Sequence, residues 1–406
     1  MQSQQPKLWT RNFISVSVSN FFLFMTFYFL LVTMPVYVLN EMEGKESEAG
    51  LVTTVFLLSA IIIRPIAGRW IEKIGARMIL LASLLIFSGV TVIYFSVDSI
   101  WALMVTRFIH GIGFGMATTA TGSIVAAIIP DSRRGEGMGY FVLSSNLAMV
   151  AGPFLGLTAM QQWGVSTMLL MGVISSFIGL MAGLFISIPK KRSKTQKEVQ
   201  VKGSFSFKEL FELNAIPIAV TGAFFAIVYS SILSFVSIYA VEIGVGHVAS
   251  YFFVVYAVVL LISRPYSGKW YDLYGANAIV YPSIILFAIG MFILGVADSA
   301  FLFLVAAAFA GLGWGTLFPS YQTIAITVAH PKRRPVATAT FLSIYDIGIG
   351  LGSFIVGLAA AKVSLGTLYM FSSVYILIGV VIYYLLQGRR FSEERQKQKQ
   401  KQVVDN

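Results

Sequence analysis

Three ionisable side chains interrupt long apolar stretches of the sequence, and their types and positions could carry chemistry. They are Asp346, Arg107 and His110. A charged group at the centre of a membrane helix costs about 2.5–3.5 kcal/mol on insertion scales, so such a group is rarely kept without a use. A carboxyl group in this place could take up a proton on one side of a membrane and release it on the other. The alternative for Asp346 is a structural acid paired with a neighbouring helix.

Arg107 and His110 are three residues apart and therefore share one face of a helix. Arg107 could line a cavity and bind substrate or tune a nearby acid. Its long side chain could instead reach outward to water. His110 titrates near neutral pH and could relay protons, but a lone histidine can also be a hydrogen-bonded packing residue.

The elements that must position these residues are predicted by the apolar composition. Of the 406 residues, 57% are hydrophobic and 12% charged, against roughly 25% charged in soluble domains. Twelve apolar runs are long enough to cross a membrane as helices and too long for barrel strands. They cover residues 13–39, 50–67, 78–97, 100–129, 137–160, 165–188, 215–240, 250–267, 277–297, 300–329, 336–361 and 366–387. The sequence predicts an all-α polytopic membrane protein.

The positions of the charges predict the orientation. With the N-terminus inside, the inner connections and tails hold 24 of the 29 Lys and Arg, whereas the outer connections hold two bases and seven acids. This bias predicts a multi-pass protein of a cell membrane, bacterial by expectation, with both termini cytoplasmic. The net charge of +11 is thus an orientation signal and not a nucleic-acid site, and the basic run from Lys190 to Lys197 suits contact with lipids.

The two halves of the chain repeat with a period of 200 residues. The segment Arg64–Trp70 recurs as Arg264–Trp270, and the glycine triplet that begins at Gly111 recurs from Gly311. Six helices per copy give parallel repeats related by a pseudo-two-fold axis along the membrane normal. The predicted domains are a six-helix bundle over 1–188, a cytoplasmic linker over 189–214, a second six-helix bundle over 215–390 and a cytoplasmic tail over 391–406. Asn146 occupies the position of Asp346 in the first copy.

These motifs resemble the major facilitator superfamily of secondary transporters over the whole chain. The connection after the second run carries Gly68, Glu72, Gly75 and Arg77, with a second copy that includes Asp272. The fourth run carries the arginine-containing motif at Arg107. The fifth run contains Gly152 and Pro153 in a sequence similar to that of drug-exporting antiporters. The resemblance implies the twelve-helix fold and the branch that exports drugs or metabolites in exchange for protons.

Two motif regions are candidates for conformational gating. Glu72 lies among Arg69, Lys73 and Arg77, where charge pairs could latch one conformation; the alternative is that these bases only hold the loop inside. Small residues around Gly152, with a proline kink, suggest that the fifth helix pivots against a helix of the other half. Helix packing alone could also require them.

Further cavity candidates come from polar and aromatic side chains at helical spacing. They are Ser19, Thr26, Tyr229, Ser234, Trp314 and Tyr321. Hydroxyl groups could line a cavity or bond their own helix backbone, so both interpretations stay open for the serines and threonines. The aromatic side chains could line an adaptable apolar pocket.

The sequence predicts proton-coupled efflux of a small organic molecule, a drug or a metabolite, by alternating access. The alternative is uptake or facilitated diffusion of a sugar, nucleoside or organic anion. The chain has no cysteine and no clustered catalytic or metal-binding motif, so we expect no enzyme, no metal site and no cofactor. The expected partners are the substrate, protons and membrane lipids, with no nucleic acid, and the expected state is a monomer. The first apolar run has no acid, unlike that of many drug antiporters, so coupling would use Asp346.

Overall fold

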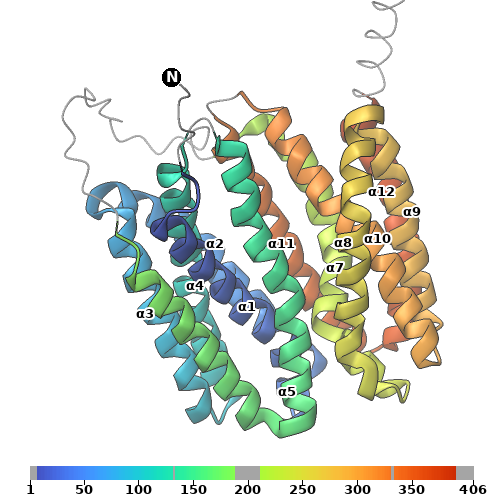
Figure 1. The fold of residues 1–406 in the computed structure, drawn as a ribbon. Coiled ribbons are helices and arrows are strands. Elements are labelled where there is room, and N and C mark those ends of the chain that lie inside the picture. Colours follow the sequence, from blue (N-terminus) through green and yellow to red (C-terminus); the bar gives the residue numbers. More distant parts are fainter. Residues whose placement is uncertain (1–6, 131–132, 188–210, 331–332, 390–406) are drawn as a thin grey trace, which may run out of the picture. The chain divides into compact units, whose positions relative to one another are not determined.

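The computed structural model describes residues 7–130, 133–187, 211–330 and 333–389. Within these ranges, the structure does not describe the side chains of 72, 134–136, 139, 264–269, 271–272 and 334–335. Every regular element of the described part is a helix (Figure 1). The chain forms two compact units. The first consists of Met1–Leu31 with Val55–Leu210, and the second of Val32–Thr54 with Phe211–Asn406.

The first unit is built mainly from α3, α4 and α5, with parts of α1 (Arg11–Asn40) and α2 (Glu46–Ile74). Helix α3 (Ala76–Ile93) continues into the short 3-10 helix η1 (Tyr94–Ser96), and α4 covers Ile100–Ile128. Ser99 caps α4, because its side chain accepts a hydrogen bond from the Ala102 amide. Helix α3 packs against α4 and α5.

Helix α5 (Arg134–Leu184) contains both the fifth and the sixth predicted runs. The two helical stretches join at Gly164, which has a φ of 81° and a ψ of 176°. A residue with a side chain rarely adopts such a positive φ, so glycine here permits the chain to turn from one stretch into the next.

The second unit continues from η3 (Leu213–Ala215) into α7 (Ile216–Glu242). The remaining elements are η4 (Gly246–Val248), α8 (Ala249–Tyr274), α9 (Ala276–Gly295), α10 (Ala300–Thr327), α11 (Arg334–Ala360), α12 (Leu365–Tyr383) and the π-helical η6 (Tyr384–Gly388). Helix α10 packs against α9 and α8, α11 against α7, and α12 against α9. Long helices packed along one another are the expected solution in lipid, where each backbone group must be bonded inside its own segment.

Eleven helices of the described part are long and apolar enough to cross a membrane. One of them is the 45-residue stretch Tyr140–Leu184, which contains the break at Gly164. The predicted all-helical membrane fold is therefore confirmed. Twelve separate spans, and the bundle boundaries at 188 and 215, stay predictions.

Equivalent glycines make equivalent contacts in the two units. A Cβ atom added at Gly113 would lie 3.0 Å from the backbone nitrogen of Phe87, and one at Gly313 would lie 2.4 Å from that of Phe287. Both contacts bring a pair of helices to backbone distance, α4 with α3 and α10 with α9. The 200-residue period of the sequence thus corresponds to repeated packing inside each unit.

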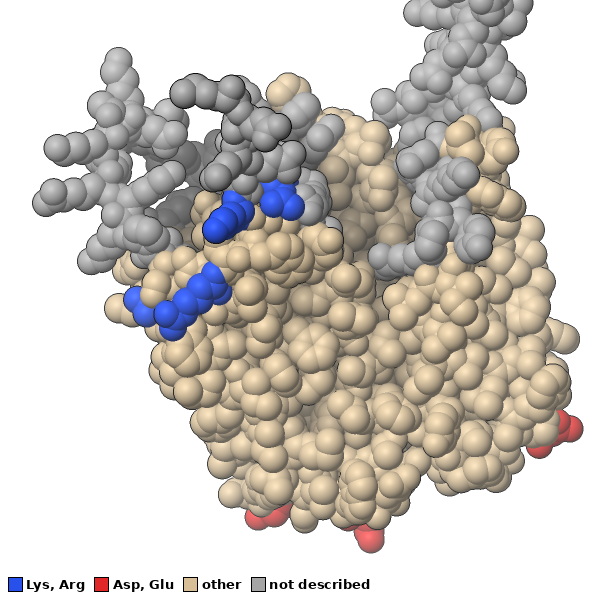
Figure 2. Space-filling model, in the orientation of Figure 1, with Lys and Arg blue, Asp and Glu red and all other residues tan. Residues whose placement is uncertain are grey.

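Exposed charges flank both ends of α3 in the first unit. Arg69, Lys73 and Arg77 are exposed around the connection from α2 to α3, and Asp98 is exposed beyond the other end of α3. Figure 2 shows basic side chains gathered near the end at which α2 passes into α3. At 1.5 Å per residue, α3 and η1 separate the two ends by about 30 Å, close to the thickness of the hydrocarbon core.

Candidate functional site

Arg107 and His110 lie on the buried face of α4, one turn apart, and neither is exposed to solvent. The guanidinium carbon of Arg107 lies 4.3 Å from the centroid of the Phe56 ring. The His110 ring lies 4.1 Å from the centroid of Phe87, and its Nδ1 is 3.0 Å from the hydroxyl of Tyr94. The structure therefore brings two of the predicted site residues together in an aromatic enclosure.

This enclosure answers one of the questions that the sequence left open. A fully buried Arg107 does not extend outward to water; its charge faces the Phe56 ring, where a desolvated cation–π contact is worth about 2 kcal/mol. The hydroxyl of Tyr94 also interacts with the Arg107 side chain. Within the described residues, Nε2 of His110 has no hydrogen-bond partner. The Arg107 guanidinium can therefore act as a positive charge that is held at a fixed place beside the His110 imidazole.

Asp346 lies in the second unit, on α11, and its side chain is partly exposed. Gly350 and Ser353 follow it at i+4 and i+7 on the same face. That face meets the first part of α2: the Thr54 hydroxyl donates to the Gly350 carbonyl at 2.5 Å, and the Ser353 hydroxyl donates to the Gly50 carbonyl at 3.2 Å. Asp346 thus lies one turn beyond the α2–α11 contact.

Glycines allow α2 and α11 to approach at this contact. A Cβ atom added at Gly50 would lie 2.2 Å from the carbonyl oxygen of Ser353. One added at Gly357 would lie 2.5 Å from the carbonyl oxygen of Glu46. Both contacts are with backbone atoms, so a side chain would require the helices to separate.

The predicted hydroxyl candidates are used in contacts between helices of one unit. Ser19, which is fully buried, donates to the Gly179 carbonyl at 2.9 Å. Thr26 shares a 2.8 Å hydrogen bond with Ser175. In the second unit, Ser234 shares a 2.8 Å hydrogen bond with Ser353. Helix packing accounts for these hydroxyls; their role in a cavity stays a prediction.

Two of the predicted aromatic candidates stack on each other in the second unit, and the third lies apart from them against Phe225 and Tyr383. The rings of Tyr229 and Trp314 stack at 5.1 Å between centroids, and Trp314 stacks with Tyr345 at 6.0 Å. Tyr345 is partly exposed, whereas the other two are buried. Tyr321 is fully buried, and its hydroxyl has no hydrogen-bond partner among the described residues.

The gating candidates after α2 are only partly within the described residues. The side chains of Glu72 and Asp272 lie outside them, so the predicted charge latch stays a prediction. Gly75 has a φ of 92°, and an added Cβ atom would meet nothing within 4 Å, so its conformation and not its packing favours glycine. Gly68 likewise has free space around it, and Arg77 is exposed.

Gly152 lies against α1, and the predicted pivoting of the fifth helix stays a prediction. The Cβ position of Gly152 lies 2.8 Å from the carbonyl oxygen of Met25 and 2.8 Å from the backbone nitrogen of Phe29. Both residues are on α1 in the same unit, and not on a helix of the other half. The small residue lets α1 and α5 pack closely. Pro153 follows inside α5.

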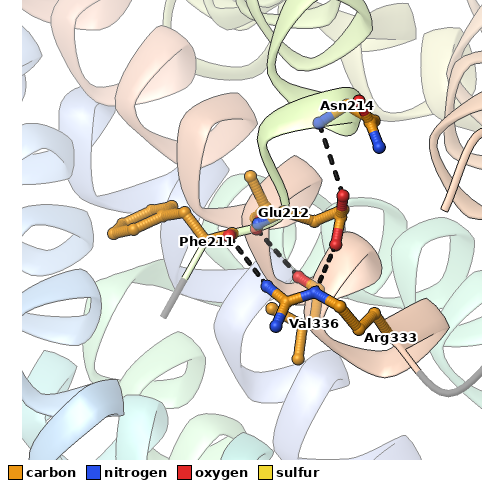
Figure 3. A network of polar contacts seen from close by, with 6 residues as sticks. Phe211, Glu212, Asn214, Arg333 and Val336 are labelled. Carbon is orange, nitrogen blue, oxygen red and sulfur yellow. Dashed lines mark hydrogen bonds and ion pairs between the residues drawn. The ribbon is translucent and has the colours of Figure 1, made fainter. Parts of the chain in front are cut away.

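Sequence reasoning missed an ion pair that joins the start of α7 to the start of α11 (Figure 3). Arg333 donates from Nε to the Glu212 carboxylate at 2.5 Å and from a second nitrogen to the Phe211 carbonyl at 3.0 Å. The Glu212 backbone donates to the Thr340 hydroxyl at 2.9 Å. The hydrogen bond from Arg333 lowers the pKa of Glu212. The pair is 121 residues apart, and no local motif indicates it.

Comparison with known proteins places these features in a family. The chain matches the Major Facilitator Superfamily over residues 16–277 and 245–405. It is 22% identical over 362 residues to an uncharacterized MFS-type transporter of Methanocaldococcus jannaschii, covering 87% of this chain and 93% of that one. It is 20% identical over 365 residues to the staphylopine export protein of Staphylococcus aureus, covering 85% and 89%.

The chain is also similar to a third protein over a shorter stretch and to two solved structures. The quinolone resistance protein NorA of Staphylococcus aureus is 28% identical over 136 residues, 34% of this chain and 35% of that one. An inward-facing, unoccupied bacterial homologue of the lysosomal transporter Spinster gives a TM-score of 0.75 at 15% identity, covering 94% and 98%. The nucleoside transporter NupG gives 0.73 at 12% identity, covering 92% and 99%. These two structures share the fold.

Proposed function

Because the chain belongs to the Major Facilitator Superfamily, and is thus a membrane transporter and not an enzyme, we propose that it exports a small organic molecule in exchange for protons. Support for export comes from one relative that is named for export and from another that is named for drug resistance. The staphylopine export protein matches over 85% of this chain, and the quinolone resistance protein NorA over a third of it. The proposed substrate is a drug or a metabolite, and the proposed location is a bacterial plasma membrane with both termini cytoplasmic.

The position of Asp346 carries the proposal. It is the one acid within the predicted spans, it is partly exposed, and it lies one turn from the α2–α11 contact on the same face of α11. A carboxyl group there can bind a proton when that face is open to one side of the membrane and release it when the face is open to the other. A substrate that competes with the proton would then be exchanged for it.

Alternating access needs a contact that can open, and the α2–α11 contact suits this role. It includes close backbone approaches at glycines and two hydrogen bonds from hydroxyl groups. We propose that it closes one side of the transport path. The equivalent glycine contacts in both units support the proposed twelve-helix architecture with a parallel repeat.

Arg107 serves this function by its charge and position, with the His110 ring one turn away on α4. A buried guanidinium over an aromatic ring keeps its charge through the transport cycle and contributes a constant field to the first unit. The uptake alternative relied on Arg107 to hold an anionic group. Its burial against Phe56 gives that alternative no support.

The test compares metabolites and drug tolerance in cells that carry the wild type, Asp346→Asn or Asp298→Asn. The second variant is the matched control, since it removes an exposed carboxylate at the end of a connection. Export predicts that Asp346→Asn cells retain a compound that wild-type and Asp298→Asn cells release. No retained compound and unchanged drug tolerance would contradict export through Asp346. A compound depleted in Asp346→Asn cells would indicate uptake.

A further inference from the structure

A group of uncharged polar side chains joins α1, α4 and α5 inside the first unit. The Asn20 amide nitrogen donates to the Ser144 hydroxyl at 2.9 Å and to the Ser145 hydroxyl at 2.8 Å. The Thr121 hydroxyl donates to the Asn20 amide oxygen at 3.4 Å. Asn20 is only 1% exposed, so both of its N–H groups are used within the unit. The amide therefore fixes the orientation of the two serine hydroxyls.

The two serines differ in what remains of their hydrogen-bonding capacity. The Ser144 hydroxyl donates to the Phe141 carbonyl at 2.6 Å, so its hydrogen is already used. The Ser145 oxygen accepts from Asn20, and its own hydrogen has no acceptor among the described residues. Ser145 is partly exposed. A hydroxyl whose lone pair is held by an amide points its hydrogen away from that amide.

The next residue along α5, Asn146, adds an amide about 100° around the helix from Ser145, between Ser145 and the side that carries Leu143 and Leu147. Asn146 is partly exposed, and no hydrogen bond ties it to any other residue of the described chain. Leu143 and Leu147 lie on the opposite side of α5 from Ser145 and are 39% and 44% exposed. In a membrane the leucine side suits lipid, whereas polar groups with unused hydrogen bonds belong toward water or a ligand.

We propose that Ser145 and Asn146 form an uncharged hydrogen-bonding subsite for a carbonyl or hydroxyl group of the transported molecule, with Asn20 as the positioning residue. This proposal rests on the proposed function, because it assigns part of the substrate site. Ser145 supplies an oriented donor, and Asn146 supplies a donor and an acceptor. A site that hydrogen-bonds a substrate group discriminates strongly against analogues without that group, because its polar atoms are then left without partners.

The first test needs no substrate and uses the absence of cysteine from the sequence. Ser145→Cys, Asn146→Cys and Leu147→Cys each introduce a single thiol into α5. A hydrophilic methanethiosulfonate reagent is applied to both faces of open membrane fragments. The subsite predicts fast labelling of the first two variants and slow labelling of Leu147→Cys. Labelling of Ser145→Cys that is absent, or no faster than that of Leu147→Cys, would overturn the proposal.

The second test measures transport of two probes in proteoliposomes. Norfloxacin carries a ring carbonyl and a carboxylate, whereas tetraphenylphosphonium has no hydrogen-bonding group. Ser145→Ala should raise the KM for norfloxacin roughly 3- to 10-fold at unchanged kcat. It should leave tetraphenylphosphonium unaffected, and Ser145→Thr should restore the wild-type KM. Ser144→Ala is the matched control, because its hydroxyl is already used.

The outcomes separate the subsite from the proposed function. An equal effect of Ser145→Ala on both probes, or an equal effect of Ser144→Ala and Ser145→Ala on norfloxacin, would overturn the subsite. If the wild type moves neither probe while Ser145→Cys is labelled fast, drug export fails as the function and the labelling still supports the subsite.

Discussion

Gly50 offers the sharpest perturbation of the α2–α11 contact. A methyl group at this position would lie 2.2 Å from the Ser353 carbonyl oxygen, which is far inside van der Waals contact. Because the obstacle is backbone, relief requires α2 and α11 to separate. Overpacking of this kind costs about 1–3 kcal/mol. If the contact opens during transport, Gly50→Ala should shift the balance toward the open arrangement by about 5- to 150-fold.

The assay is the labelling rate of a single cysteine placed at the contact. Thr54→Cys puts a thiol beside the Gly350 carbonyl, where the wild-type hydroxyl donates at 2.5 Å. In this background Gly50→Ala should speed labelling by an impermeant thiol reagent, and Gly357→Ala should do the same, since its added methyl would lie 2.5 Å from the Glu46 carbonyl oxygen. Gly89→Ala is the control, because its Cβ position meets nothing within 4 Å.

The result that would refute this reasoning is equally specific. If both contact variants fold as monodisperse protein and label at the rate of Gly89→Ala, the α2–α11 contact does not open and close. A faster rate in all three variants would point to general destabilisation and would equally contradict a local closure.

Three further predictions concern stability. Arg333 lowers the pKa of Glu212. The pair therefore stabilises the fold at pH values above the ordinary glutamate pKa of about 4.3. This contribution is lost as the pH falls through the lowered pKa of Glu212. Arg333→Gln should cost at most about 1 kcal/mol at pH 7, because water partly screens the pair, and unfolding curves of variant and wild type should converge in acid. Phe56→Leu should lower the melting temperature by removing the ring under Arg107, whereas Phe56→Trp should retain most of the contact. Gly164→Ala should destabilise the fold by about 1–2 kcal/mol through its positive φ, which denaturant unfolding would measure; equal stability would contradict the required turn.

The sequence was sufficient for features that depend on composition and period. Apolar runs predicted the membrane helices, and the 200-residue offset pairs Gly113 with Gly313, which make the same contact in each unit. Insertion energetics act on each segment separately, so such features are visible without tertiary information. Helical spacing also placed Arg107 and His110 on one face, as the structure confirms.

Features that depend on distant partners could not be read from the sequence. The bonds of Asn20 reach residues 124 and 125 positions away, and that of Glu212 reaches a residue 121 positions away. Ser19 fits a cavity stripe as well as it fits a packing contact until the neighbouring Gly179 carbonyl is known. The contact of Gly152 with α1 could not be read from the sequence for the same reason: helical spacing fixes the face of a helix but not the helix that covers it.

Proton coupling through Asp346 is tested most directly by flux in proteoliposomes with an imposed pH gradient. The substrate is the compound that Asp346→Asn cells retain, and flux is followed with and without a protonophore. We predict that wild-type flux collapses when the gradient is dissipated, and that Asp346→Asn no longer responds to the gradient while Asp298→Asn responds as the wild type does. Wild-type flux that is insensitive to the gradient, or an Asp346→Asn response equal to that of the wild type, would contradict proton-coupled export through this residue.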